Sequence, residues 1–104
     1  IIAKFKGTRF GLADIMGPGT AAVEVTIDKG EPKVINRFDA FSTYYRLNFF
    51  ILKDLSPGGH IAKIKLIKGS LNKAEILKTR NYTIKAQDQS TYKNEAMYVG
   101  AVLY

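Results

Sequence analysis

The chain has 104 residues, 46% of them hydrophobic and 24% charged, and its 16 basic and nine acidic residues give a formal net charge of +7. This size and composition indicate one globular domain and exclude a disordered chain. The absence of cysteine excludes a disulfide framework, a thiol nucleophile and cysteine-ligated metal sites. No apolar run approaches the roughly 20 residues of a membrane helix, so we expect no membrane partner.

The first half of the chain predicts strands and turns. Residues 22–28 alternate, with Val23, Val25 and Ile27 facing inward. Residues 28–31 (DKGE) predict a hairpin turn in which Gly30 takes a positive φ. The predicted strands are residues 3–6, 8–12, 22–28 and 33–38.

The second half continues this pattern. Residues 44–52 are apolar on both faces, which predicts a central strand covered on both sides. Residues 60–68 alternate, with apolar side chains predicted inward and basic ones outward: Ala62, Ile64 and Leu66 against His60, Lys63 and Lys65. Residues 82–86 and 97–104 complete the strands. Only residues 70–79 favour a helix, where Asn72 and Glu75 have capping-box spacing.

Seven or eight short strands separated by turns predict an all-β fold, an antiparallel β-sandwich of jelly-roll type or a barrel, with at most one short helical turn. Residues 1–104 are predicted to form a single module. The apolar run 99–104 at the chain end leads us to expect a domain excised from a longer multidomain protein, whose last strand continues there. No signal peptide is visible, which in a fragment has no bearing on localisation.

The positive charge indicates anionic partners, and nucleic acid is the alternative that it raises. However, the lysines occupy outward positions of alternating strands, where they also protect strand edges. The aromatic residues fall mainly on the predicted central strand and not beside those lysines, which disfavours a nucleic-acid surface. The lysines concerned are Lys4, Lys6, Lys63, Lys65 and Lys85.

The sequence contains no recognisable catalytic set, so we expect no enzyme within this chain and no cofactor. There is no Gly-x-Ser-x-Gly motif, and Gly17-Pro18-Gly19 lacks the Lys-Ser/Thr of a phosphate loop. His60, the single histidine, follows a Pro-Gly-Gly turn, where it is expected to begin a strand. The aspartates follow no calcium-loop spacing, although a structural calcium held by scattered loop oxygens stays open.

Polar and aromatic residues alternate in one segment, where Tyr44, Arg46 and Asn48 share a face. An aromatic ring beside planar hydrogen-bonding groups is typical of sugar recognition. The opposing interpretation is that Arg46 pairs with Asp39 or Asp14 inside the sandwich and that the tyrosines are core residues. The candidate glycan-binding residues are Arg9, Asp14, Arg37, Tyr44 and Arg46.

Seven stretches, spread along nearly the whole chain, carry a family resemblance. They are Phe5-Lys6-Gly7-Thr8-Arg9-Phe10-Gly11-Leu12 with Asp14-Ile15-Met16-Gly17-Pro18-Gly19, Asn36-Arg37-Phe38-Asp39-Ala40 with Thr43-Tyr44-Tyr45-Arg46-Leu47, Leu55-Ser56-Pro57-Gly58-Gly59-His60, Lys73-Ala74-Glu75-Ile76-Leu77 and Tyr98-Val99-Gly100-Ala101-Val102-Leu103. In this order they resemble the β-sandwich (jelly-roll) accessory domain of bacterial SGNH/GDSL-type hydrolases. Those multidomain proteins are similar to carbohydrate esterases that deacetylate plant or microbial polysaccharides.

The resemblance implies a secreted or periplasmic bacterial protein with a separate catalytic domain, since the catalytic serine block is absent here. It transfers no ligand residues to this chain. The expected function is a non-catalytic accessory module that either binds glycan or packs beside the catalytic domain of its parent chain.

Overall fold

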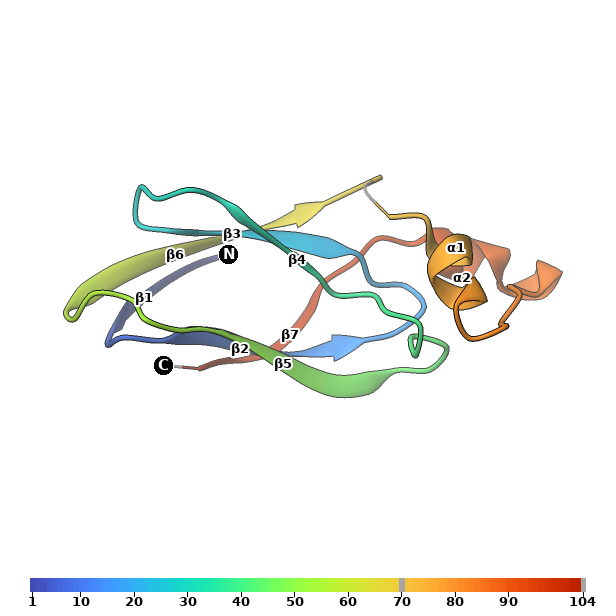
Figure 1. Ribbon diagram of the computed structural model, residues 1–104, viewed down its shortest axis with the longest axis horizontal. Helices are drawn as coiled ribbons and strands as arrows, with labels where there is room; N and C mark the ends of the chain where they lie inside the picture. Colours follow the sequence, from blue (N-terminus) through green and yellow to red (C-terminus); the bar gives the residue numbers. More distant parts are fainter. Residues whose placement is uncertain (70, 104) are drawn as a thin grey trace.

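The structure, a computed structural model, describes residues 1–69 and 71–103, and it confirms the predicted all-β antiparallel sandwich (Figure 1). One sheet has four strands in the order β1-β6-β3-β4, and the other has three in the order β5-β2-β7. The strands are β1 (Ile2–Lys6), β2 (Phe10–Met16), β3 (Ala22–Ile27), β4 (Lys33–Asn36), β5 (Arg46–Leu52), β6 (Gly59–Ile67) and β7 (Tyr98–Leu103).

The main core lies between the two sheets and is built from the inward residues of the alternating strands. The pattern predicted for Val23 and Val25 on β3, and for Ala62 and Ile64 on β6, is confirmed, because all four side chains are buried. Phe10 contributes from the three-stranded sheet, and its ring centroid lies 5.1 Å from that of Phe5 on β1. The two pleated layers therefore share one apolar interior, as period-2 alternation requires.

A second, smaller core lies at one end of the molecule, among helices α1 (Lys73–Lys78) and α2 (Gln89–Lys93) and the 3-10 turn η1 (Ala86–Asp88) (Figure 1). Phe38, Leu77 and Tyr92 are its buried members. The predicted helix is present as α1, and Asn72 caps it by accepting a hydrogen bond from the Glu75 N–H at 3.2 Å. The segment 86–93 adds a further helical turn, and residues 82–86, predicted to be a strand, form none. Ser70 and Tyr104 lie outside the described residues.

The position of residues 44–52 differs from the prediction. β5 is an edge strand of the three-stranded sheet, and β2 lies at its centre. The inward side of β5 packs on the core through Phe50 and Leu52, whereas its outward side is exposed. The prediction assumed that a strand apolar on both faces has both faces covered, and the described residues cover only one.

Two smaller expectations are also wrong. His60 faces inward at the start of β6 and is buried, since its ring stacks on Phe5 at 5.2 Å. In the hairpin between β3 and β4, Asp28 takes the positive φ (54°), and Gly30 does not. Asp28 tolerates this conformation because its carboxylate and amide are both fixed by β6, through Ile61.

Candidate interaction surface

The outward side of the three-stranded sheet is uniformly apolar. On β2, Gly11, Ala13 and Ile15 point outward. Each of them is paired with an outward residue of β5 on one side and of β7 on the other. We call this surface the apolar face. Its nine residues are Leu47, Phe49 and Ile51 on β5, Gly11, Ala13 and Ile15 on β2, and Tyr98, Ala101 and Leu103 on β7.

Large side chains of the apolar face are open to solvent. Leu47 is 71% exposed and Phe49 61% exposed, and Ile51 and Tyr98 are also exposed. None of the nine residues is charged. Single exposed apolar residues are ordinary on a protein surface, but a contiguous apolar sheet face marks an interaction site.

A glycine at one end of the apolar face keeps its central strand, β2, close to β5. A Cβ on Gly11 would lie 2.3 Å from the carbonyl oxygen of Phe50, so no larger residue fits without separating the strands. At the end of the face, the ring of Tyr45 lies against Gly17, where a Cβ would meet it at 2.3 Å, and contacts Tyr98 edge-on at 6.0 Å. The glycines of the turn at 17–19 thus admit an aromatic ring rather than a phosphate.

The four-stranded sheet has a different outward side. Lys4 and Lys6 on β1 and Lys63 and Lys65 on β6 project from adjacent strands, as the sequence predicted, and Glu24 stands opposite Lys65. The strand residues that share this side include no Phe, Tyr or Trp. The lysines therefore lack the aromatic partners on which bases stack in single-stranded nucleic-acid sites.

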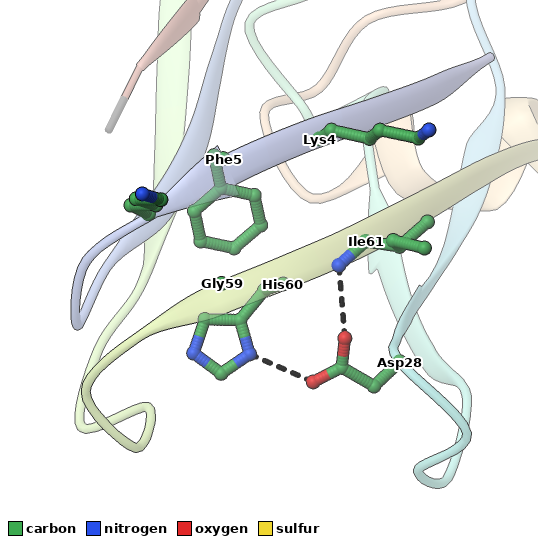
Figure 2. A pocket seen from close by; sticks show the side chains of 7 residues that line it. Lys4, Phe5, Asp28, Gly59, His60 and Ile61 are labelled. Atoms are coloured by element: carbon green, nitrogen blue, oxygen red, sulfur yellow. Dashed lines mark hydrogen bonds and ion pairs between the residues drawn. The ribbon is translucent and has the colours of Figure 1, made fainter.

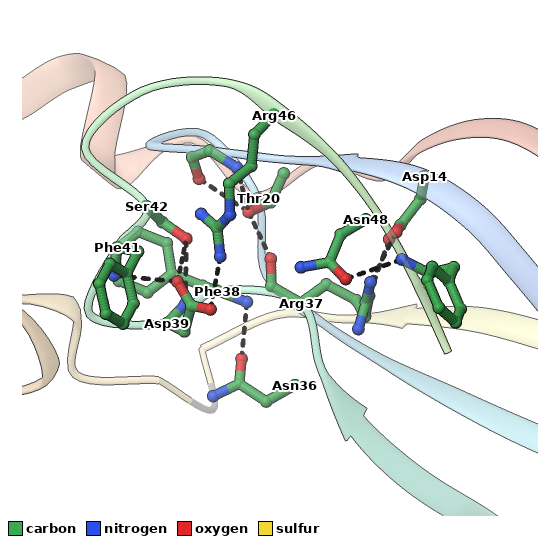
Figure 3. A network of polar contacts seen from close by, with 12 residues as sticks. Asp14, Thr20, Asn36, Arg37, Phe38, Asp39, Phe41, Ser42, Arg46 and Asn48 are labelled. Atoms are coloured by element: carbon green, nitrogen blue, oxygen red, sulfur yellow. Dashed lines mark hydrogen bonds and ion pairs between the residues drawn. The ribbon is translucent and has the colours of Figure 1, made fainter. Parts of the chain in front are cut away.

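Two of the predicted glycan-binding residues bind each other inside the protein (Figure 3). The guanidinium of Arg37 donates to both carboxylate oxygens of Asp14, at 2.7 and 2.6 Å, and stacks over the ring of Phe50 at 5.0 Å. Arg37 is 7% exposed and Asp14 3% exposed. This buried pair joins the two sheets and is not accessible to a sugar. The opposing interpretation had given such a structural role to a pair of Arg46 with Asp39 or Asp14.

Arg46 and Tyr44 lie at the end of β5 next to the loop 39–45. Arg46 donates to Asp39 at 2.5 Å, as the opposing interpretation expected, and its guanidinium lies 6.0 Å from the ring centroid of Tyr44. Burial alone would raise the pKa of Asp39, but hydrogen bonds from Arg46, the Phe41 N–H and the Ser42 hydroxyl outweigh it and lower that pKa. Tyr44 and Tyr45 are exposed, so the tyrosines are not core residues.

Arg9 lies at the opposite end of the sandwich, in the turn between β1 and β2, near Lys53 and Asp54. The seven-residue strand β2 separates it from the Arg46 end by about 20 Å. The structure therefore brings four of the five predicted residues together in two pairs, Asp14 with Arg37 and Tyr44 with Arg46, and leaves Arg9 apart. The exposed ring of Phe41, with the Arg80 guanidinium 4.0 Å above it, was not predicted, because residues 41 and 80 are far apart in sequence.

A shallow pocket of about 750 Å³ opens beside β1 and the start of β6, at His60 (Figure 2). One ring nitrogen of His60 lies 2.7 Å from the Asp28 carboxylate and the other 2.5 Å from the Ser56 carbonyl oxygen. Both partners only accept hydrogen bonds, so this arrangement favours the imidazolium form, in which both nitrogens donate. The Asp28 carboxylate, followed by the Ser56 carbonyl, raises the pKa of His60, and His60 in turn lowers the pKa of Asp28.

This histidine is committed to structural partners on both nitrogens, so it offers neither a general base nor a metal ligand. Within residues 1–69 and 71–103, no group of three or more His, Asp or Glu side chains is arranged to hold a metal ion. The same residues form no helix with the length and apolarity needed to cross a bilayer.

Comparison of the chain with protein-family models, with curated proteins and with solved structures finds no match in any of the three. The functional assignment therefore depends on the residues of this chain. The apolar face is the feature that sequence reasoning missed, and its signal was the apolar character of residues 44–52 on both faces.

Proposed function

We propose that this chain is a non-catalytic β-sandwich module that docks onto a protein partner through the apolar face. The observation that carries the proposal is the exposure of Leu47, Phe49 and Ile51 in one row beside the outward residues of β2 and β7. Removing apolar area from water is favourable by roughly 25 cal/mol per Å² before the entropic costs of association are counted, so a face of this kind gains from being covered.

The partner that fits the sequence resemblance is the catalytic domain of a secreted or periplasmic SGNH-type hydrolase. In that arrangement, this module supplies a rigid wall beside the catalytic domain and shapes its cleft. The chemistry would belong entirely to the partner, because the histidine of this chain is held by Asp28 and Ser56.

The test uses an SGNH-type catalytic domain that carries a Gly-Asp-Ser block, expressed separately and titrated with this module in a calorimeter. Leu47→Lys places a charge in the apolar face and should weaken binding by roughly tenfold or more. Val34→Lys is the matched control, because Val34 is 65% exposed on the four-stranded sheet. Equal binding by both variants would contradict docking through this face.

Glycan binding at the loop 39–45 is a second candidate. It is favoured by the exposed rings of Tyr44 and Phe41, each beside a guanidinium, from Arg46 and Arg80 respectively. Affinity electrophoresis against a panel of soluble polysaccharides tests it, with Tyr44→Ala as the variant and Val34→Lys as the control. If no polysaccharide retards the unmodified chain, this candidate is removed.

A further inference from the structure

One edge of β7 carries no strand. β7 pairs with β2 along its other edge, and within the described residues it pairs with no second strand. Its sequence, YVGAVL, contains neither a charge nor a proline. An edge strand without such protection is a ready template for another strand.

The other three edge strands are protected. β1 carries Lys4 and Lys6, β4 has only four residues, follows Pro32 and begins at Lys33, and β5 begins at Arg46. β7 is thus the least protected edge of the sandwich. Val99 points inward in register with the buried Asp14, yet it is 36% exposed, which shows that the residues described by the structure leave this edge open.

A bulge at Gly100 sets which way the side chains of β7 point. Ala13 is paired with Ala101, whereas the next residue, Asp14, is paired with Val99, so Gly100 is an extra residue in the ladder. Residues paired across a ladder share a face. Tyr98, Ala101 and Leu103 therefore point outward with Ile15, Ala13 and Gly11, and Val99 and Val102 point inward with Asp14 and Leu12.

This arrangement suits pairing of β7 with its own copy. Opposed residues of two antiparallel strands must point to the same face. In two copies of a regular strand, whose neighbouring residues point to opposite faces, this is possible only if the two-fold axis lies at a residue that is paired with the same residue of the second copy. The extra residue in β7 allows the axis to fall between Gly100 and Ala101 instead. Tyr98 then opposes Leu103 of the second copy, both outward, and Val99 opposes Val102 of the second copy, both inward.

We propose that the free edge of β7 is a self-association site, where two copies of this chain pair antiparallel through β7 about a two-fold axis between Gly100 and Ala101. The two three-stranded sheets then form one continuous six-stranded sheet. Every opposed pair combines apolar residues of complementary size, including Gly100 with Ala101 at the axis. A second copy fits better than an unrelated strand, because from residue 98 to 103 outward side chains oppose outward ones and inward side chains oppose inward ones.

Pairing at this edge is separate from docking on the apolar face. The two apolar faces become neighbours in one sheet and both stay open to the partner proposed above. The lysines Lys4, Lys6, Lys63 and Lys65 lie on the other sheet, so none of them stands within the strand pair.

Opposite charges at Ala101 test the proposal. Ala101 is exposed and adjoins the axis, so Ala101→Lys places two like charges side by side, and so does Ala101→Glu. In sedimentation equilibrium we expect the unmodified chain to dimerise and each variant to raise the dimer dissociation constant by roughly tenfold or more. An equimolar mixture of the two variants should recover dimerisation, because Lys then faces Glu.

Leu47→Lys is the control that distinguishes this inference from the proposed function, since it should weaken docking and leave the dimer intact. An unmodified chain that stays monomeric up to its solubility limit would overturn the inference, and so would a dimer that Leu47→Lys disrupts and the Ala101 variants do not.

A cysteine pair tests the register. The chain has no cysteine, so Tyr98→Cys with Leu103→Cys provides the only thiols. The two positions are about 17 Å apart on one extended strand, so they cannot form a disulfide within a chain. Oxidation should give a covalent dimer faster than for Tyr98→Cys with Val102→Cys, whose cysteines point to opposite faces. Equal rates would overturn the register.

Discussion

Asp14 and Arg37 form a buried, two-pronged ion pair that links the centre of the three-stranded sheet to the end of β4 in the four-stranded sheet (Figure 3). A second ion pair joins Arg46, at the start of β5, to Asp39 in the loop after β4. The residues that suggest a polar binding site in the sequence therefore connect the two sheets. Because the charges of Asp14 and Arg37 are removed from water, these two residues depend on each other.

Asp14→Ala should lower the free energy of unfolding by about 3–5 kcal/mol, because it leaves the Arg37 guanidinium buried without its partner. The double variant Asp14→Leu with Arg37→Met should recover most of this loss, since it removes both charges and keeps the volume. Urea unfolding followed by circular dichroism provides the measurement. A double variant less stable than Asp14→Ala would show that the pair is irreplaceable rather than mutually dependent.

The His60–Asp28 contact predicts that stability depends on pH in two directions. The pKa of His60 is raised above its ordinary 6.5, so its contribution is complete below pH 6.5 and is lost as the pH rises through the raised value. The pKa of Asp28 is lowered below 3.8, so its contribution is present above pH 3.8 and is lost as the pH falls through the lowered value. The stabilisation from this contact is therefore greatest between pH 3.8 and 6.5.

Asp28→Asn should move the pKa of His60 back toward its ordinary value and flatten this pH dependence. NMR titration of the ring measures it directly, because His60 is the only histidine. An unchanged titration curve in Asp28→Asn would mean that the Ser56 carbonyl alone holds the imidazolium.

Gly11→Ala should destabilise the protein by roughly 1–3 kcal/mol, because the added Cβ meets the Phe50 carbonyl oxygen and forces β5 away from β2. Gly59→Ala is the matched control, since nothing lies within 4 Å of its Cβ and its φ is not positive. Thermal unfolding of the two variants should give a lowered midpoint for Gly11→Ala alone. Similar midpoints would show that β5 shifts without cost.

Thr20→Val should cost about 1–3 kcal/mol of stability, because it leaves the buried carbonyl oxygen of Arg37 without a donor. The Thr20 hydroxyl lies 2.6 Å from that oxygen, is buried, and accepts a hydrogen bond from the Gly17 N–H. Thr20→Ser keeps the hydroxyl and should lose only about 1 kcal/mol, through the missing methyl group. Chemical denaturation at one pH compares the two, and equal losses would place the effect in the methyl group.

Alternation along single strands made the sandwich predictable. Val23, Val25, Ala62 and Ile64 face inward as the pattern required, because a strand with one wet side must separate its polar and apolar residues. The cap at Asn72 was predictable because it is local, since its hydrogen bond spans only three residues.

The candidate site was less predictable because it depends on pairings between distant segments. Asp14 and Arg37 are 23 residues apart, and His60 and Asp28 are 32 apart, so no local pattern indicates that they meet. The prediction that residues 44–52 form a central strand was wrong for a different reason. The sequence records that both sides of this strand are apolar, but not whether the second side is covered by the same chain.

The two sheets give the module unlike sides, one bearing lysines and the other hydrocarbon. A module covered on its apolar face would therefore turn the Lys4, Lys6, Lys63 and Lys65 side toward the solvent, and the outer surface of the assembly would be basic there.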